Sequence, residues 1–275
     1  MIDFKTILAA GVVTLAVGAG GAFAQDKVSY GTNWLAQAEH GGFYQAVADG
    51  TYAKYGLDVT IRQGGPQGAN RSLLIGGQID FYMGGMTTAI DAVKEGIPTL
   101  TIASIFQKDP QVLICHPGQG NDSLAALKGK PVLIGAAGRT SFYPFLKAKF
   151  GYSDEQVRPY TFNMAPFLAD KSMCQQGYLT SEPFAIEKEG GVKPVVHLLA
   201  DSGYDPYSTT ISISQKMVDE KKDVVQRFVT ATLEGWAAYM KNGEGNAAAN
   251  IPRLSDVSTR LKREDIVTMV RAGKG

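Results

Sequence analysis

The segment TLTIASIFQKDPQVLICHP, residues 99–117, holds two apolar runs rich in β-branched residues, with only the polar stretch QKDPQ between them. Runs of this kind predict β-strands. Elsewhere in the chain, strand-like and helix-like segments alternate, which is typical of an α/β protein with mostly parallel, covered sheets. Residues 99–117 break this alternation because no helix separates the two strands.

The same break recurs in LLADSGYDPYSTTISI, residues 198–213. Both breaks are explained if the chain leaves one α/β lobe at the first and returns to it at the second. We therefore predict an α/β fold of two lobes joined by two crossover hinge segments. Lobe I would comprise residues 25–108 and 206–275, and lobe II residues 109–205. A single doubly wound domain stays the alternative.

Three further elements are expected from local patterns. Apolar residues at helical spacing predict a helix over 41–55, ended by Gly56, and the stretch GYLTSE, residues 177–182, is interpreted as a strand. Residues 224–240 predict an amphipathic helix with Trp236 in the core.

The first 24 residues have the pattern of a secretory signal peptide. A short start with one lysine precedes an apolar, glycine-rich stretch, and the small-residue motif AFA ends at Ala24. We expect cleavage after Ala24 and a periplasmic mature protein. An N-terminal anchor helix is the alternative.

Charge and histidine spacing exclude two classes of function. The chain has 27 Lys and Arg against 26 Asp and Glu, so it lacks the basic character of a nucleic-acid-binding protein. His40, His116 and His197 are far apart, without the spacing of metal ligands, so we expect no metal site. We interpret His197 as a core strand residue and His116 as exposed.

The mature chain has two cysteines, Cys115 and Cys174. An exported protein can hold a disulfide, but a chain of this length is stabilised by its hydrophobic core and does not depend on a single disulfide. Two free, buried thiols are the favoured interpretation, and a Cys115–Cys174 bridge is the alternative.

Glycine-rich or polar loops follow several predicted strands, where open α/β sheets bind their ligands. They include NWLAQAEHGG (33–42), QGGPQGAN (63–70), MGGMTT (83–88), GAAGRTSFY (135–143) and TSEPF (180–184). From them we take as candidate ligand-binding residues Gly64, Gly65, Gly85, Thr87 and Thr140. Ordinary turn chemistry is the alternative for each loop taken alone.

Aromatic residues also gather near predicted strand ends and crossings: Trp34, Tyr44, Tyr82, Phe142, Tyr143, Tyr178, Tyr204 and Tyr207. Flat ligands are held by stacking and a few polar groups in a mostly apolar cleft. Packing between lobes is the alternative for several of them. The chain has no phosphate-loop motif, no dinucleotide fingerprint and no Gly-x-Ser-x-Gly elbow, and no nucleophile and base that we would pair. We therefore predict a binding protein and not an enzyme.

The first loop carries a resemblance. Trp34, the run His40-Gly-Gly-Phe-Tyr44 and the segment DGTYAKYGLDVTI resemble the signature of substrate-binding proteins related to thiamine-pyrimidine synthase. That group belongs with the nitrate, sulfonate and taurine receptors of ABC importers. The resemblance covers roughly residues 28–240.

The resemblance implies a two-lobed periplasmic binding protein fold of type II that closes over a small ligand and delivers it to an ABC permease and its ATPase. It implies ring contacts from Trp34, His40 and Glu182, and Tyr44 and Tyr178 are further site residues carried over on a weaker match. Glu182 precedes Pro183, so capping of a helix N-terminus is the alternative role for its carboxylate.

Fungal synthases in this superfamily carry a cysteine-rich motif and bind pyridoxal phosphate on a lysine, whereas this chain has no cysteine cluster. Family members also usually continue further than residues 242–275 do, which leaves the cover of lobe I in question. We expect a monomeric receptor, without cofactor, for a small polar heterocycle such as a thiamine-pyrimidine precursor. A sulfonate, nitrate or taurine receptor and, less favoured, a synthase-like enzyme are the alternatives.

Overall fold

The computed structural model describes residues 24–65 and 69–241. The expected signal peptide, apart from Ala24, lies outside these residues, as does the segment 242–275. None of the helices that the structure describes has the length and hydrophobicity needed to cross a membrane.

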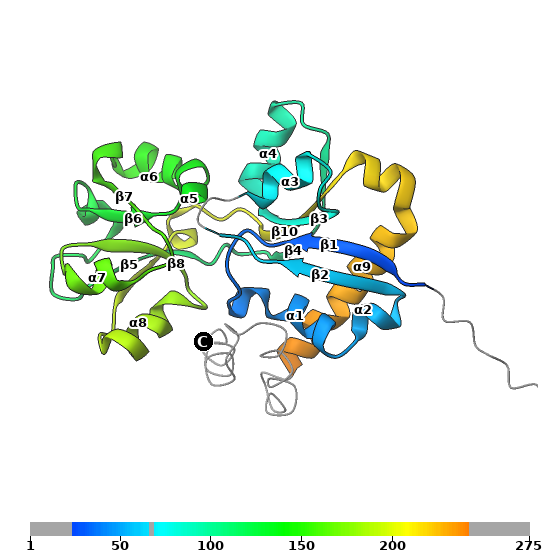
Figure 1. Cartoon of the computed structure of the whole chain (residues 1–275). Coiled ribbons are helices and arrows are strands. Elements are labelled where there is room, and N and C mark those ends of the chain that lie inside the picture. The colour runs from blue at the N-terminus through cyan, green and yellow to red at the C-terminus, as the bar shows by residue number, and fades with distance from the viewer. Residues whose placement is uncertain (1–23, 66–68, 242–275) are drawn as a thin grey trace, which may run out of the picture.

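Ten strands form two separate five-stranded sheets in the described residues (Figure 1). The first has the order β2-β1-β3-β10-β4, and the second the order β7-β6-β8-β5-β9. The first sheet consists of β1 (Asp26–Gly31), β2 (Leu57–Arg62), β3 (Phe81–Gly85), β4 (Thr99–Phe106) and β10 (Ser208–Ser214). The second consists of β5 (Gln111–Cys115), β6 (Val132–Ile134), β7 (Val157–Pro159), β8 (Cys174–Tyr178) and β9 (Val195–Leu198).

The chain changes sheet at the two places where the sequence breaks its alternation. It leaves the first sheet after Phe106 and returns to it at Ser208. We use lobe I and lobe II for the two sheets with the helices around them; the division at residues 108 and 205 stays a prediction. In each sheet one strand runs against the other four, β10 in lobe I and β5 in lobe II. Each of these strands directly follows a crossover.

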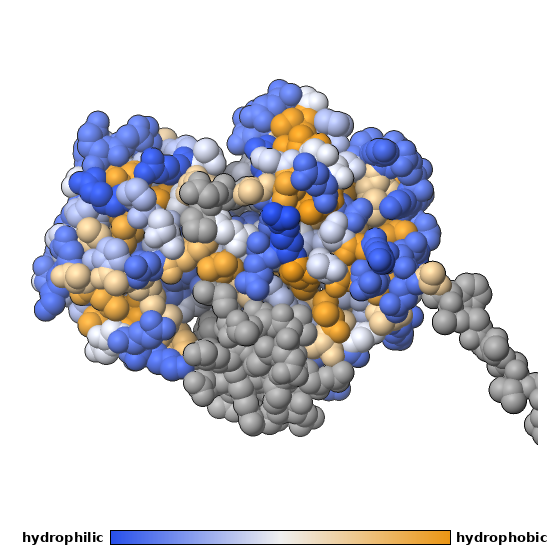
Figure 2. All heavy atoms as spheres, in the orientation of Figure 1, coloured by the Kyte–Doolittle hydropathy of each residue, from blue (hydrophilic) through white to orange (hydrophobic). Residues whose placement is uncertain are grey.

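Helices cover both sheets, so the predicted α/β class is confirmed. Lobe I carries α1 (Gly41–Ala48), α2 (Thr51–Lys54), α3 (Asn70–Ile75), α4 (Met86–Lys94), α9 (Gln215–Lys241) and the 3₁₀ helix η1 (Ala38–His40). Lobe II carries α5 (Ala136–Thr140), α6 (Tyr143–Phe150), α7 (Ala165–Ala169), α8 (Glu182–Gly190) and the 3₁₀ helices η2 (Leu124–Leu127) and η3 (Asp154–Gln156), and η4 (Ala200–Ser202) follows β9. Figure 2 shows hydrophilic residues over much of the visible outer surface of both lobes, with hydrophobic residues near α4.

Two expected elements differ from the structure. The helix expected over 41–55 is divided at Asp49–Gly50, because Gly50 has a φ of 77° and starts a new turn. The strand expected over 177–182 is wrong, since β8 ends at Tyr178 and α8 begins at Glu182. Strand β8 has the sequence CQQGY, and its two glutamines are why a search for apolar runs does not find this buried strand.

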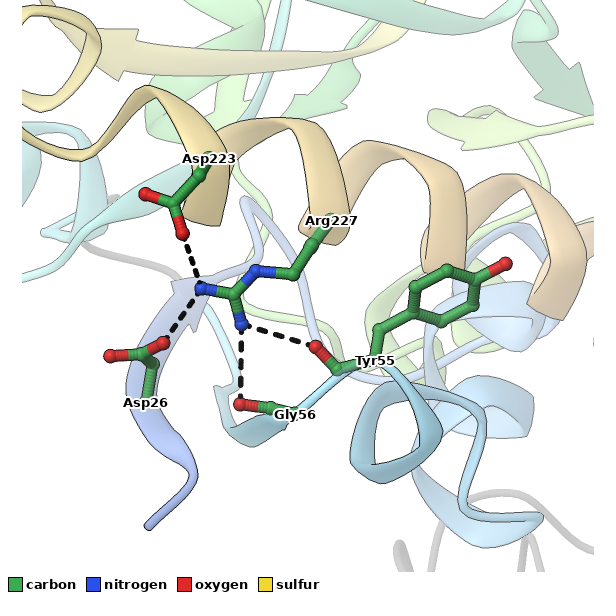
Figure 3. Close-up of polar contacts among 5 residues, drawn as sticks. All are labelled: Asp26, Tyr55, Gly56, Asp223 and Arg227. Carbon is green, nitrogen blue, oxygen red and sulfur yellow. Dashed lines mark hydrogen bonds and ion pairs between the residues drawn. The ribbon is translucent and has the colours of Figure 1, made fainter. Parts of the chain in front are cut away.

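Helix α9 closes lobe I. Its Phe228 stacks on Phe81 at a ring-centroid distance of 3.9 Å, and the expected core residue Trp236 is 8% exposed. Arg227 ties the helix to the edge of the sheet (Figure 3). It donates to Asp26 and Asp223 at 2.7 Å each and to the backbone oxygens of Tyr55 and Gly56.

The cysteine prediction is wrong, because Cys115 and Cys174 form a disulfide. The two residues stand opposite each other in the β5–β8 ladder, with their Cα atoms 4.4 Å apart. The register of two strands creates this proximity across 59 residues of sequence, and spacing alone could not reveal it.

The expectation for His116 is also wrong. It is 3% exposed, stacks on the Phe167 ring and makes a 2.7 Å hydrogen bond between Nε2 and the Phe167 carbonyl. His197 lies in β9 and is half-buried, as a strand residue beside the core would be.

Candidate functional site

A cleft with about 100 Å³ of free volume lies between the two lobes. Its walls come from the loop and 3₁₀ turn after β1, the β3–α4 junction, both crossovers, the α5–α6 region and the β8–α8 junction. The polar lining residues include Asn33, Gln37, Glu39, His40, Thr87, Asp109, Gln111, Ser141, Gln176, Glu182 and Ser208. The aromatic ones are Trp34, Tyr82, Phe142, Tyr178 and Tyr204.

A glycine pair fixes the lobe I wall of this cleft. A Cβ atom on Gly41 would lie 2.0 Å from the Tyr239 ring, and one on Gly42 would lie 2.2 Å from Trp236. Since real Cβ atoms do not approach so closely, only glycine lets α1 pack directly on α9. This packing sets the position of His40, which immediately precedes α1.

Trp34 reaches from lobe I to aromatic residues of lobe II. Its ring centroid lies 3.8 Å from Phe162 in an edge arrangement and 6.0 Å from Tyr160. Its loop is held by Gly64, whose amide donates to the Trp34 carbonyl at 3.1 Å and to Thr32 Oγ1 at 3.0 Å. A Cβ on Gly64 would lie only 2.5 Å from the Asn33 carbonyl carbon, so only glycine lets this backbone pack directly against the Trp34 loop.

Two carboxylates bridge the lobes reciprocally. Glu39 of lobe I accepts hydrogen bonds from the Ser181 and Thr180 hydroxyls of lobe II. Glu182 of lobe II accepts one from Gln37 Nε2 of lobe I at 2.9 Å. We call these five residues the interlobe clasp.

Glu182 also has a local role. Its second carboxylate oxygen accepts a 2.7 Å hydrogen bond from the Tyr178 amide, which closes the turn between β8 and α8. Glu182 therefore has both roles: it stabilises the start of α8, and it is part of the cleft wall.

His40 is fully buried and lines the cleft. Its Nδ1 accepts a hydrogen bond from the Gln37 amide at 3.2 Å. A neutral imidazole that accepts at Nδ1 carries its proton on Nε2 and can donate there.

The charge of the cleft is one-sided. Within residues 24–65 and 69–241, it is lined by the carboxyl groups of Glu39, Asp109 and Glu182 and by no lysine or arginine. Burial, followed by the charge of Glu182, raises the pKa of Glu39 to about 7. Burial raises the pKa of Asp109 to about 7 as well, against the lowering effect of a hydrogen bond from the Gln111 amide.

Six of the ten candidate residues from the sequence line the cleft: Trp34, His40, Gly85, Thr87, Tyr178 and Glu182. Gly64, Gly65 and Thr140 do not line it. Tyr44 is 1% exposed within the lobe I core, because it projects inward from α1. That these six residues contact a ligand is still a prediction.

Sequence reasoning missed several polar residues of the cleft, above all Gln37, Glu39, Asp109 and Gln176. Glu39 stands next to His40 in the quoted loop, and its burial beside another acid depends on the partner lobe. Gln176 lies in the strand whose position was misjudged; its Oε1 accepts from the Gly135 amide at 2.7 Å.

The described residues do not form a site for a metal ion or for pyridoxal phosphate bound to a lysine. Across the described part of the chain, no group of three or more His, Cys, Asp or Glu side chains is placed to hold a metal ion. A lysine-bound cofactor needs a lysine in the cleft, and none of the described lining residues is one.

Comparison with known structures defines the class. The chain is similar to the periplasmic aliphatic sulphonate binding protein SsuA of Escherichia coli, with a TM-score of 0.66 and 15% identity over 90% of this chain and 79% of the other. The fold is thus that of periplasmic binding proteins, as expected. The protein belongs to the NMT1/THI5-like family, whose pattern matches residues 37–245.

Two curated relatives lie at greater sequence similarity. The riboflavin-binding protein RibY of Chloroflexus aurantiacus is 23% identical over 78% of this chain and 63% of its own length. The 4-amino-5-hydroxymethyl-2-methylpyrimidine phosphate synthase of Schizosaccharomyces pombe is 26% identical over 46% of this chain and 37% of its own. The chain therefore spans less than two thirds of the length of either relative.

Proposed function

We propose that this protein is a receptor for a small, flat heterocycle that carries no net negative charge, and that it delivers this ligand to an ABC permease. A thiamine-pyrimidine precursor is the favoured ligand. The observation that carries the proposal is the lining of the cleft, where aromatic rings and three carboxyl groups occur without a lysine or arginine among the described residues.

The aromatic part of the lining suits a flat ring. Trp34, Tyr82 and Phe142 offer faces and edges, and such contacts add to the burial of apolar area. The carboxyl groups of Glu39 and Glu182 and the imidazole of His40 belong to the same lining. An aminopyrimidine has both ring acceptors and amino donors, which matches this set.

The size of the cleft favours one ring over three. The free volume here is about 100 Å³, less than the roughly 150 Å³ of a cavity known to hold benzene, so even a single substituted ring requires a slight opening of the lobes. Riboflavin, which RibY is named for, has a three-ring system and would require a wider opening of the lobes. It therefore ranks below a single-ring ligand.

A sulfonate or nitrate receptor is the second alternative, motivated by the likeness to SsuA. Anions are usually held by arginine, lysine or clustered backbone amides. The three carboxyl groups of the cleft would repel an anionic ligand. A synthase-like enzyme is the third alternative, motivated by the similarity to the Schizosaccharomyces pombe synthase. It ranks last because the described lining residues include no lysine for the cofactor.

The location and partners follow from the same proposal. A receptor of this kind is exported, and its signal peptide, residues 1–24, is removed by cleavage after Ala24. The mature protein works in the periplasm as a monomer, together with an ABC permease and its ATPase. Linkage of the gene to a permease and an ATPase would support this part of the proposal.

Titration calorimetry tests the ligand class. The panel comprises 4-amino-5-hydroxymethyl-2-methylpyrimidine, riboflavin, taurine and nitrate. We expect saturable binding of the pyrimidine at micromolar Kd, about −8 kcal/mol, and none of taurine or nitrate. Binding of taurine or nitrate without binding of a heterocycle would overturn the proposal.

A variant pair locates the binding site. Trp34→Ala should abolish measurable binding. Tyr207→Ala, which removes an aromatic ring that is 50% exposed and lies outside the cleft lining, should leave the affinity unchanged.

A further inference from the structure

Asp109 is a carboxyl group in the cleft whose hydrogen bonding is incomplete. It lies in the first crossover and is 6% exposed. Its amide donates to Asp205 Oδ1 of the second crossover at 2.9 Å, and its own Oδ1 accepts from the Gln111 amide at 2.7 Å. Its Oδ2 accepts no hydrogen bond from any residue of the described part of the chain.

Among the residues that the structure describes, the groups around Asp109 do not supply a cation. The titratable side chains that face it are Asp205 and Tyr204 from the second crossover and Tyr178 from β8. The neighbouring Lys108 is paired instead with Asp201 at 2.9 Å on an exposed surface. A buried carboxylate without a cationic partner is costly, so a ligand that supplies one would gain a strong interaction.

Asp109 lies in the first crossover, against Asp205 of the second, and so at the hinge side of the cleft. Tyr178 is near both Asp109 and Glu39: burial, and then the charges of these two groups, raise the pKa of its hydroxyl, which is hydrogen-bonded to Ser208 Oγ at 2.9 Å. A ligand ring held near Trp34 could thus present one substituent toward the clasp and another toward Asp109.

We infer that Asp109 is a ligand-binding residue that receives a cationic or N–H-donating substituent through Oδ2, and that it makes the receptor selective for ligands with such a group. This inference rests on the proposed function and adds a specificity-determining residue to it. Because the two crossovers meet at the Asp109 amide and Asp205, a ligand bound there also contacts the hinge.

A matched pair of probes tests the inference. 4-Amino-5-hydroxymethyl-2-methylpyrimidine is neutral at its side group, whereas the 5-aminomethyl analogue carries a cation at the same position. At pH 8 we expect the wild-type protein to bind the aminomethyl compound at least tenfold more tightly. Asp109→Asn should remove this preference. Asp201→Asn, which removes an exposed carboxylate near the same crossover, should keep it.

A second readout needs no variant. Binding of the cation should lower the pKa of Asp109, so at pH 7 the wild-type protein should release a fraction of a proton on binding the aminomethyl probe. Calorimetry in two buffers of different ionisation enthalpy measures this release. Asp109→Asn, if its circular dichroism shows it folded, should release less.

The outcomes separate the two proposals. If wild-type protein binds both probes equally, or binds the cation without proton release, the assignment of Asp109 is overturned while the receptor function stands. Retention of the preference in folded Asp109→Asn would overturn it too. If neither probe binds wild-type protein, the proposed function fails, and the assignment fails with it.

Discussion

At the scale of single residues, buried acids dominate the chemistry of the cleft. Glu39 lies beside the second acid of the clasp, Glu182, and Asp109 lies beside Asp205. A buried carboxyl near another acid keeps its proton to higher pH than it would in water. These acids therefore link the stability of the ligand-free protein to pH.

The sign of this dependence follows from the pKa values. Both groups titrate near 4 in an unfolded chain and at about 7 in the folded protein. The folded state thus holds more protons between about pH 4 and 7, so its free energy of unfolding falls as the pH rises through this window and levels off above it. We expect Glu39→Gln to flatten this fall, as measured by urea denaturation from pH 4.5 to 8.

The control is Asp201→Asn, since that carboxylate is exposed and paired with Lys108. It should leave the slope unchanged. An identical pH dependence in Glu39→Gln and wild-type protein would contradict the burial argument for Glu39.

At the scale of elements, the contact between α1 and α9 decides where the first loop lies. Gly42→Ala would place a methyl group 2.2 Å from Trp236, so one helix must move. Overpacking of a core costs about 1–3 kcal/mol. We expect a loss of stability of this size, measured by denaturant unfolding, together with weaker ligand binding, because His40 moves with α1.

Gly65→Ala provides the matched control. A Cβ atom on Gly65 would meet no atom of the described residues within 4 Å, and its backbone does not require glycine. This variant should retain both stability and affinity. Equal effects of the two substitutions would show that helix contact is not the reason for the glycine at position 42.

At the scale of the whole molecule, the disulfide and the two crossovers set stability and motion. Cys115 and Cys174 close a loop over a sequence separation of 59 residues in lobe II. Removing such a bridge typically costs about 2–4 kcal/mol. We expect Cys115→Ala/Cys174→Ala to lower the free energy of unfolding by this amount with ligand affinity nearly intact, since neither cysteine lines the cleft. Equal stability of the double variant and the oxidised wild-type protein would contradict this expectation.

Closure of the lobes is the second expectation at this scale. The interlobe clasp holds the two lobes together in this structure, and two crossovers permit hinge motion. We expect ligand to reduce the radius of gyration measured by solution X-ray scattering. Glu39→Ala, which removes one half of the clasp, should enlarge the ligand-free protein. A scattering profile that does not change at ligand saturation would count against closure.

Much of the fold was predictable from local sequence. Alternating strand and helix patterns determined the α/β class, and two strand pairs without a helix between them located both changes of sheet. The reason is that the period of apolar residues reflects which face of an element is buried. The same logic failed at β8, where Gln175 and Gln176 occupy buried strand positions.

The sequence also indicated most of the loops that reach the cleft, since loops that follow parallel strands meet at one edge of a sheet. The loop 63–70 is the exception, because none of its described residues lines the cleft. The sequence placed Trp34, His40 and Glu182 in the cleft, and the comparisons then established the family. What it could not supply were relations between distant residues. Only the tertiary structure brought Glu39 to Ser181, Cys115 to Cys174 and Gly42 to Trp236, because strand register and helix docking create these contacts and no local spacing encodes them.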